Sequence, residues 1–199
     1  MFIKALVAAC AIGMLAQRVE AGTCRALAMS GGGSNGAWEA GVLWGLANSG
    51  HPEDFYYDVV TGVSAGAINA AGISGFTPED VINAAQFLSD TWNSLSNDQI
   101  WWYQPDIPPV VGADIDWDLA VKGFLEYNGA VNDAPALETL DLILQGFPEG
   151  YKRSIVLAAA DVETGEYVQF TEKNTSFSDL HQAALSSGSI PGVFHPQYF

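Results

Sequence analysis

Two glycine-rich stretches decide the fold of this chain: Ser30-Gly31-Gly32-Gly33-Ser34-Asn35-Gly36 and Gly62-Val63-Ser64-Ala65-Gly66. Each follows a short apolar run and precedes an apolar, alanine-rich run, so each predicts a strand, a tight turn and a helix. The second stretch has the pattern G-x-S-x-G, which places a serine on a sharp strand-to-helix turn with its hydroxyl group exposed. We therefore predict that Ser64 is a nucleophile and that backbone N–H groups of residues 31–33 bind an oxyanion.

The rest of the chain alternates strand and helix patterns. Apolar and β-branched runs predict strands at residues 25–29, 55–61, 154–162 and 167–171. Periodicity and capping residues predict helices at 36–48, 65–73, from 77 to about 88, from Asp133 to Gly146, and at 179–186 with Ser178 as its cap. An apolar stripe of the first helix consists of Trp38, Gly41, Val42, Gly45 and Leu46. This alternation predicts a three-layer α/β/α sandwich around a largely parallel sheet, with one antiparallel hairpin at residues 154–171.

Composition and charge exclude several classes of protein. The 199 residues suit one domain, and 49% hydrophobic residues with 15% charged ones exclude a disordered or fibrous chain. The formal net charge of −16 argues against binding to nucleic acid, and also against electrostatic docking on anionic membranes. The chain contains only two cysteines, so we expect no disulfide framework.

The N-terminus has the three-part pattern of a signal peptide. Lys4 supplies the charge, residues 5–16 form an apolar run too short to span a bilayer, and Val19-Glu20-Ala21 resembles a cleavage site. We predict a signal peptide at residues 1–21, a secreted protein and one domain at residues 22–199. A lipoprotein signal around Cys10 and a buried first helix are the alternatives.

The first glycine stretch also fits a rival interpretation. Gly31-x-Gly33-x-x-Gly36 matches the dinucleotide fingerprint G-x-G-x-x-G, and Asp54 or Asp58 lies about 20 residues further on, where an acid would bind a ribose hydroxyl. The predicted export signal makes a nicotinamide cofactor less favoured. No G-K-[ST] follows the glycines, which excludes a P-loop.

Four stretches occur in this order: Gly31-Gly32-Gly33-Ser34-Asn35-Gly36-Ala37, Gly62-Val63-Ser64-Ala65-Gly66, Ala160-Asp161-Val162-Glu163-Thr164-Gly165 and Ser186-Ser187-Gly188-Ser189-Ile190-Pro191-Gly192-Val193-Phe194. In this combination the chain resembles the patatin-like phospholipases, also called patatin-like acyl hydrolases, over residues 25–199. The resemblance implies a Ser–Asp dyad in which Ser64 attacks lipid ester carbonyls. It also implies that Gly31, Gly32 and Gly33 frame the oxyanion hole, with the Ala65 N–H as a further donor. Lipid or phospholipid esters at a membrane or micelle surface are the expected substrates.

The second dyad member departs from the family's pattern. In the family it is the Asp of a D-G-[GA] motif beyond the Pro-Gly-x-Phe segment, and this sequence contains neither D-G-G nor D-G-A before it stops at Phe199. We expect either that the 199 residues are a fragment lacking the C-terminal part of the fold, or that the chain cannot activate Ser64 in the family's way. A catalytically inactive protein that binds lipid or a partner is therefore the alternative function.

Residues within the chain offer two substitutes for the missing Asp. Asp161 lies in a strand–turn stretch that favours a structural role, and His195 has the position that a Ser–Asp–His triad would require. The remaining histidines, His51 and His181, are scattered and no H-E-x-x-H motif occurs, so we expect no metal or other cofactor. The aromatic segment around Trp101 to Trp117 fits either an acyl pocket or core filling.

Overall fold

The computed structural model describes residues 23–104 and 117–198 of the chain. The signal peptide predicted at residues 1–21 lies outside the described residues and stays a prediction, as does secretion. Part of the aromatic segment, residues 105–116, also lies outside them. Within the described ranges, no helix has the length and apolar character of a membrane span.

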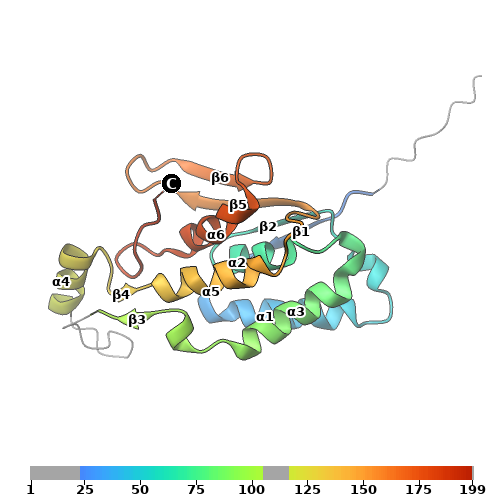
Figure 1. The fold of residues 1–199 in the computed structure, drawn as a ribbon, viewed down its shortest axis with the longest axis horizontal. Coiled ribbons are helices and arrows are strands. Elements are labelled where there is room, and N and C mark those ends of the chain that lie inside the picture. The colour runs from blue at the N-terminus through green and yellow to red at the C-terminus, as the bar shows by residue number, and fades with distance from the viewer. Residues whose placement is uncertain (1–22, 105–116, 199) are drawn as a thin grey trace, which may run out of the picture.

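Four strands form one mixed sheet in the order β1-β2-β5-β6 (Figure 1). The strands β1 (Ala26–Met29), β2 (Val59–Gly62) and β5 (Ser154–Ala160) run parallel, and β6 (Tyr167–Thr171) pairs antiparallel with β5. The predicted α/β fold with a largely parallel sheet and one hairpin is therefore confirmed. A separate antiparallel pair joins β3 (Trp102–Tyr103) to β4 (Val131–Asn132).

Most of the α-helices lie on one side of this sheet (Figure 1). They are α1 (Gly36–Ala47), α2 (Ala65–Ile73), α3 (Val81–Ser94), α5 (Ala134–Gln145) and α6 (Leu180–Gly188), and α4 (Trp117–Tyr127) lies apart near β4. Both α2 and α6 pack on the sheet, while α1 and α3 pack on α2, and α5 packs on α6 and α2. Since α2 is enclosed by the sheet and by other helices, nearly all its residues are buried, which explains its alanine- and glycine-rich sequence.

The core lies between the sheet and α2. Alternate residues of the parallel strands, among them Met29, Val60, Ile155 and Leu157, are buried against the helices, as the two-residue period of a strand requires. This packing places the carboxyl ends of β1 and β2 beside each other, so the two glycine-rich stretches leave the sheet at the same edge. Ligand sites of open parallel sheets lie at this edge.

Some local expectations differ from the structure. The second strand begins at Val59 rather than at residue 55, because Pro52–Phe55 forms a 3-10 turn. The turn before α6 is capped by Ser176, whose Oγ accepts the Asp179 N–H at 3.2 Å, and not by Ser178.

The apolar stripe of α1 does not face the core. Trp38 is 72% exposed and Val42 is also exposed, whereas Ala40 and Leu43 are buried against the neighbouring helices. The helix is apolar around most of its circumference, so its pattern could not identify the buried side.

Candidate active site

Ser64 occupies the sharp turn between β2 and α2. Its backbone angles are φ 56° and ψ −124°, a conformation that residues with a side chain rarely adopt and that costs about 1–3 kcal/mol. The N–H groups of Ala67 and Ile68 donate to the Ser64 carbonyl at 2.9 and 3.2 Å, which anchors the turn to the first turn of α2. Ser64 is the N-cap residue of α2, but its hydroxyl makes no capping hydrogen bond and stays available for chemistry.

The two glycines that flank Ser64 are required by close approach of the backbone. A β-carbon on Gly62 would overlap the carbonyl group of Gly66, and one on Gly66 would overlap the carbonyl group of Met29 at the end of β1. The turn is therefore sharp enough to bring α2 back against both strands. This is the geometry that the G-x-S-x-G pattern predicts.

The first glycine-rich stretch lies directly against Ser64. A β-carbon built on Gly31 would stand 3.1 Å from Ser64 Cβ and 3.7 Å from Ser64 Oγ. Gly33 has a φ of +56°, which favours glycine, and starts the short 3-10 turn that leads into α1. Within the described parts of the chain, the N–H groups of Gly31, Gly32 and Ala65 donate to no protein acceptor. They are thus free to hold an oxyanion beside Ser64.

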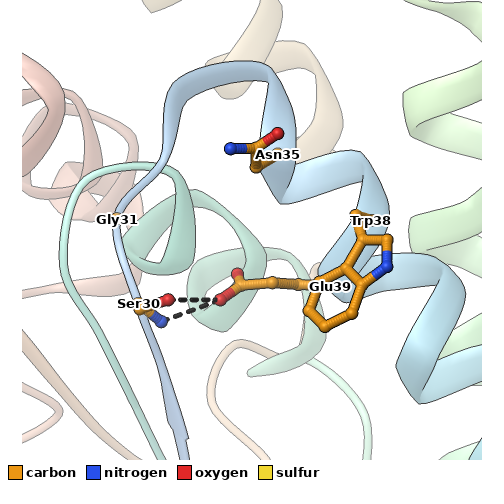
Figure 2. Close-up of a pocket in the computed structure, with 5 residues that line it drawn as sticks. All are labelled: Ser30, Gly31, Asn35, Trp38 and Glu39. Carbon is orange, nitrogen blue, oxygen red and sulfur yellow. Dashed lines mark hydrogen bonds between the residues drawn. The ribbon is translucent and has the colours of Figure 1, made fainter.

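A polar network around the buried side chain of Asn69 fixes the start of the glycine loop to the helices. The Glu39 carboxylate accepts the Ser30 N–H at 2.8 Å and the Ser30 hydroxyl at 3.1 Å through Oε1 (Figure 2). Its second oxygen accepts the side-chain amide of Asn69, a fully buried residue of α2, at 3.1 Å. That amide also donates to the Gly36 carbonyl at 3.0 Å, and its oxygen accepts the Trp92 indole N–H at 2.7 Å.

Sequence reasoning missed this network. The only available signal was Asn69 itself, a polar residue within an otherwise apolar helix, because a buried amide needs hydrogen-bond partners. Its partners on α1 and α3 are distant in the sequence. Gly36 adds a steric constraint: a β-carbon there would overlap the Trp92 ring and lie 3.1 Å from Ala65 Cβ.

A hollow of about 300 Å³ lies beside the glycine loop (Figure 2). It is lined by Ser30, Gly31, Asn35, Trp38 and Glu39. Gly31 belongs both to this wall and to the contact with Ser64, but Ser64 is not among the residues that line the hollow. The exposed indole of Trp38 gives it an apolar edge.

His195 is engaged elsewhere in the structure. Its Nδ1 lies 2.9 Å from Asp133 Oδ1, its Nε2 lies 3.3 Å from the Gln104 amide nitrogen, and the second oxygen of Asp133 accepts the Gln197 amide at 3.1 Å. Asp133 and Gln104 are buried, so this cluster ties the C-terminal segment to β3 and to the start of α5. The His195 ring therefore has partners at both nitrogens without contacting Ser64.

The other candidate acids also have structural partners. Asp161 Oδ1 accepts the N–H groups of Glu163 and Thr164 at 2.8 and 3.0 Å, and these hydrogen bonds hold the pKa of Asp161 below its usual value of 3.8. Asp161 thus shapes the β5–β6 turn. Asp58 Oδ2 accepts the Arg25 N–H at 2.8 Å, which ties the start of β1 to β2.

No metal site emerges from the described residues: nowhere in 23–104 or 117–198 do three His, Cys, Asp or Glu side chains group as metal ligands would. The described histidines outside the His195 cluster lie near single acids, His51 at 3.4 Å from Glu53 and His181 at 4.0 Å from Asp141.

Comparisons with known proteins agree with the resemblance to patatin-like phospholipases found in the sequence. A family model described as patatin-like phospholipase matches residues 27–199. No curated protein matches the chain significantly. Among solved structures, the chain is similar to VipD from Legionella pneumophila, with 17% identity and a TM-score of 0.45 over 88% of this chain and 44% of VipD.

Two structures of the effector ExoU are also similar. The ExoU–SpcU complex of the Pseudomonas aeruginosa type III secretion system gives 23% identity and a TM-score of 0.39, over 85% of this chain and 37% of that one. The structure of the type III effector protein ExoU gives 18% and 0.42, over 86% and 39%. The chain thus spans less than half the length of the solved chains it matches.

Proposed function

Because the chain belongs to the patatin-like phospholipase family, we propose that it hydrolyses lipid esters with Ser64 as the nucleophile. The observation that carries this proposal is the strained Ser64 backbone with Gly31 packed against its side chain. A strained serine whose hydroxyl is not used in capping, next to free backbone N–H groups, supplies the nucleophile and the oxyanion donors that acyl transfer needs.

The proposed reaction has two steps. Ser64 Oγ attacks the ester carbonyl carbon, and the carbonyl oxygen becomes an oxyanion that the N–H groups of Gly31, Gly32, Gly33 and Ala65 stabilise. The ester bond breaks, the alcohol leaves with a proton, and the acyl group remains on Ser64. Water then attacks this acyl-enzyme, releases the fatty acid and restores the serine hydroxyl.

The positive end of α1 supports this assignment of the oxyanion hole. The short turn at Gly33–Asn35 runs directly into α1, so the helix dipole favours negative charge near the glycine loop. The network of Glu39 and Asn69 anchors the same loop from behind. A loop held in this way donates its N–H groups without reorganising during the reaction, which is the condition for strong oxyanion stabilisation.

The base that takes the Ser64 proton is the open part of the mechanism. The family resemblance implies an Asp in a D-G-[GA] motif, which these 199 residues lack. Within the described residues, the Ser64 hydroxyl has no carboxylate or imidazole partner, since Asp161 and His195 are bonded elsewhere. This observation supports the second candidate function, a lipid-binding protein without turnover.

Fatty-acid release from phosphatidylcholine in mixed micelles separates the two functions. We expect the 199-residue chain to release fatty acid and Ser64→Ala to reduce release to background, because the nucleophile is lost. Ser94→Ala is the matched control, since Ser94 is an exposed serine at the end of α3. Release that survives Ser64→Ala contradicts the proposal. Micelle binding without release by the unmodified chain favours the second function.

A further inference from the structure

Ser187, in the last turn of α6, contacts the backbone of Ser64 across 123 residues of sequence. Its Oγ accepts the Ser64 N–H at 2.8 Å and donates to the Ala158 carbonyl of β5 at 2.5 Å. A single hydroxyl therefore connects the candidate nucleophile, the sheet and a distant helix.

The Ser64 N–H depends on this contact. An N-cap residue lies ahead of the helix, and Ser64 also lies beyond the last residue of β2, so neither element supplies an acceptor for this group. Because the Ser187 hydrogen is donated to Ala158, the oxygen lone pairs face the Ser64 N–H. The chain of donors thus runs in one direction, from Ser64 through Ser187 to the sheet.

The neighbouring serines do not share this role. Ser186 Oγ donates to the Gln182 carbonyl at 2.8 Å, and Ser189 Oγ donates to the Leu185 carbonyl at 2.9 Å, both within the same helical segment. Ser187 alone of the three reaches the Ser64 turn. Ser186 and Ser189 are therefore control positions for Ser187.

We propose that Ser187 is a positioning residue for the nucleophile. By fixing the peptide plane between Val63 and Ser64, its hydroxyl sets the direction of the Ser64 side chain toward Gly31 and stabilises the strained backbone. The expected effect of Ser187 on the reaction rate rests on the proposed function. The hydrogen bond itself can be tested without turnover.

The test compares variants at position 187 with a matched one. In the full chain, Ser187→Ala and Ser187→Val are expected to lower the second-order rate constant for labelling by a fluorophosphonate about tenfold, the rate equivalent of one hydrogen bond. Ser187→Thr keeps the hydroxyl in nearly the shape of Val and is expected to restore most of the rate. Ser186→Ala is expected to label at the unmodified rate. In micelle hydrolysis, kcat falls and KM stays unchanged for Ser187→Val.

Hydrogen exchange of the Ser64 amide tests this hydrogen bond without depending on labelling or turnover. We expect faster exchange at this amide in Ser187→Val than in Ser187→Thr or Ser186→Ala. Equal labelling rates for the Thr and Val variants, or an equal loss in Ser186→Ala, would overturn the inference. If the unmodified chain is not labelled at all, the proposed function fails, and the exchange of the Ser64 amide alone decides the role of Ser187. Unchanged exchange in Ser187→Val then rejects it.

Discussion

At the scale of single residues, backbone geometry distinguishes required glycines from replaceable ones. Gly62 faces the Gly66 carbonyl so closely that no side chain fits, whereas Gly41 on α1 has open space around its Cα. In the sequence, Gly62 belongs to the G-x-S-x-G pattern that predicts a sharp turn, whereas Gly41 lies within a helical stretch. The difference arises from the turn at Ser64 and from the exposed position of Gly41.

Alanine substitutions test this distinction. We expect Gly62→Ala to lower the free energy of unfolding by about 3 kcal/mol, because the β-carbon displaces backbone that cannot move independently. Gly41→Ala is expected to raise it by about 0.5–1 kcal/mol, because alanine favours a helix interior. Denaturant unfolding of both variants gives the measurement. Similar values for the two would contradict the account of the turn.

Asp161 makes the β5–β6 turn sensitive to acid. Hydrogen bonds from the N–H groups of Thr164 and Glu163 lower the pKa of Asp161 below 3.8, so the folded state favours the carboxylate. A carboxylate with a lowered folded-state pKa stabilises the fold above the unfolded pKa, and this stabilisation is lost as pH falls through the folded pKa. We expect the difference in Tm between the unmodified chain and Asp161→Ala to shrink below pH 3.8. A difference that is constant down to pH 2 would contradict this role.

At the scale of elements, the sequence predicted the bounds of helices and strands where residues near in the chain determine them. The bounds of α2 and β6 agree with the prediction to the residue, because glycine turns and short apolar runs delimit them. The buried face of α1 and the contact of Ser187 with Ser64 could not be predicted in the same way. Each depends on which distant element packs there, and α1 offers apolar side chains such as Trp38 on the exposed side as well.

The polar network behind the glycine loop gives a further prediction. Asn69→Leu removes a fully buried amide and leaves the Trp92 indole N–H and one Glu39 oxygen without their partner. We expect a loss of about 1–3 kcal/mol in the free energy of unfolding, the cost of unpaired buried polar groups. The fluorophosphonate labelling rate should also fall, because the glycine loop loses its anchor.

An exposed hydrogen bond of the same chemistry serves as the control. The Trp44 indole donates to the Gln86 amide oxygen at 2.8 Å on the surface between α1 and α3. Gln86→Leu is expected to change stability by about 0.5 kcal/mol or less, since water replaces the lost partner. Equal effects of the two substitutions would show that the Asn69 network has no special role.

At the scale of the whole molecule, the net charge of −16 restricts the lipid surfaces on which the chain could act. Electrostatic repulsion opposes approach to anionic bilayers and is screened by salt over about 10 Å at 0.1 M ionic strength. We expect hydrolysis of phosphatidylcholine vesicles to be faster than hydrolysis of phosphatidylglycerol vesicles at low salt, and the ratio to approach one near 1 M salt. Faster hydrolysis of the anionic vesicles would contradict this expectation.

The lipid hydrolysis that we propose depends on Ser64 as the nucleophile. The most direct test is to treat the full chain with a fluorophosphonate and to locate the adduct by peptide mass spectrometry. We predict one adduct, on the peptide that contains Ser64, and its loss in Ser64→Ala but not in Ser94→Ala. An adduct on another residue, or labelling that persists in Ser64→Ala, would contradict it.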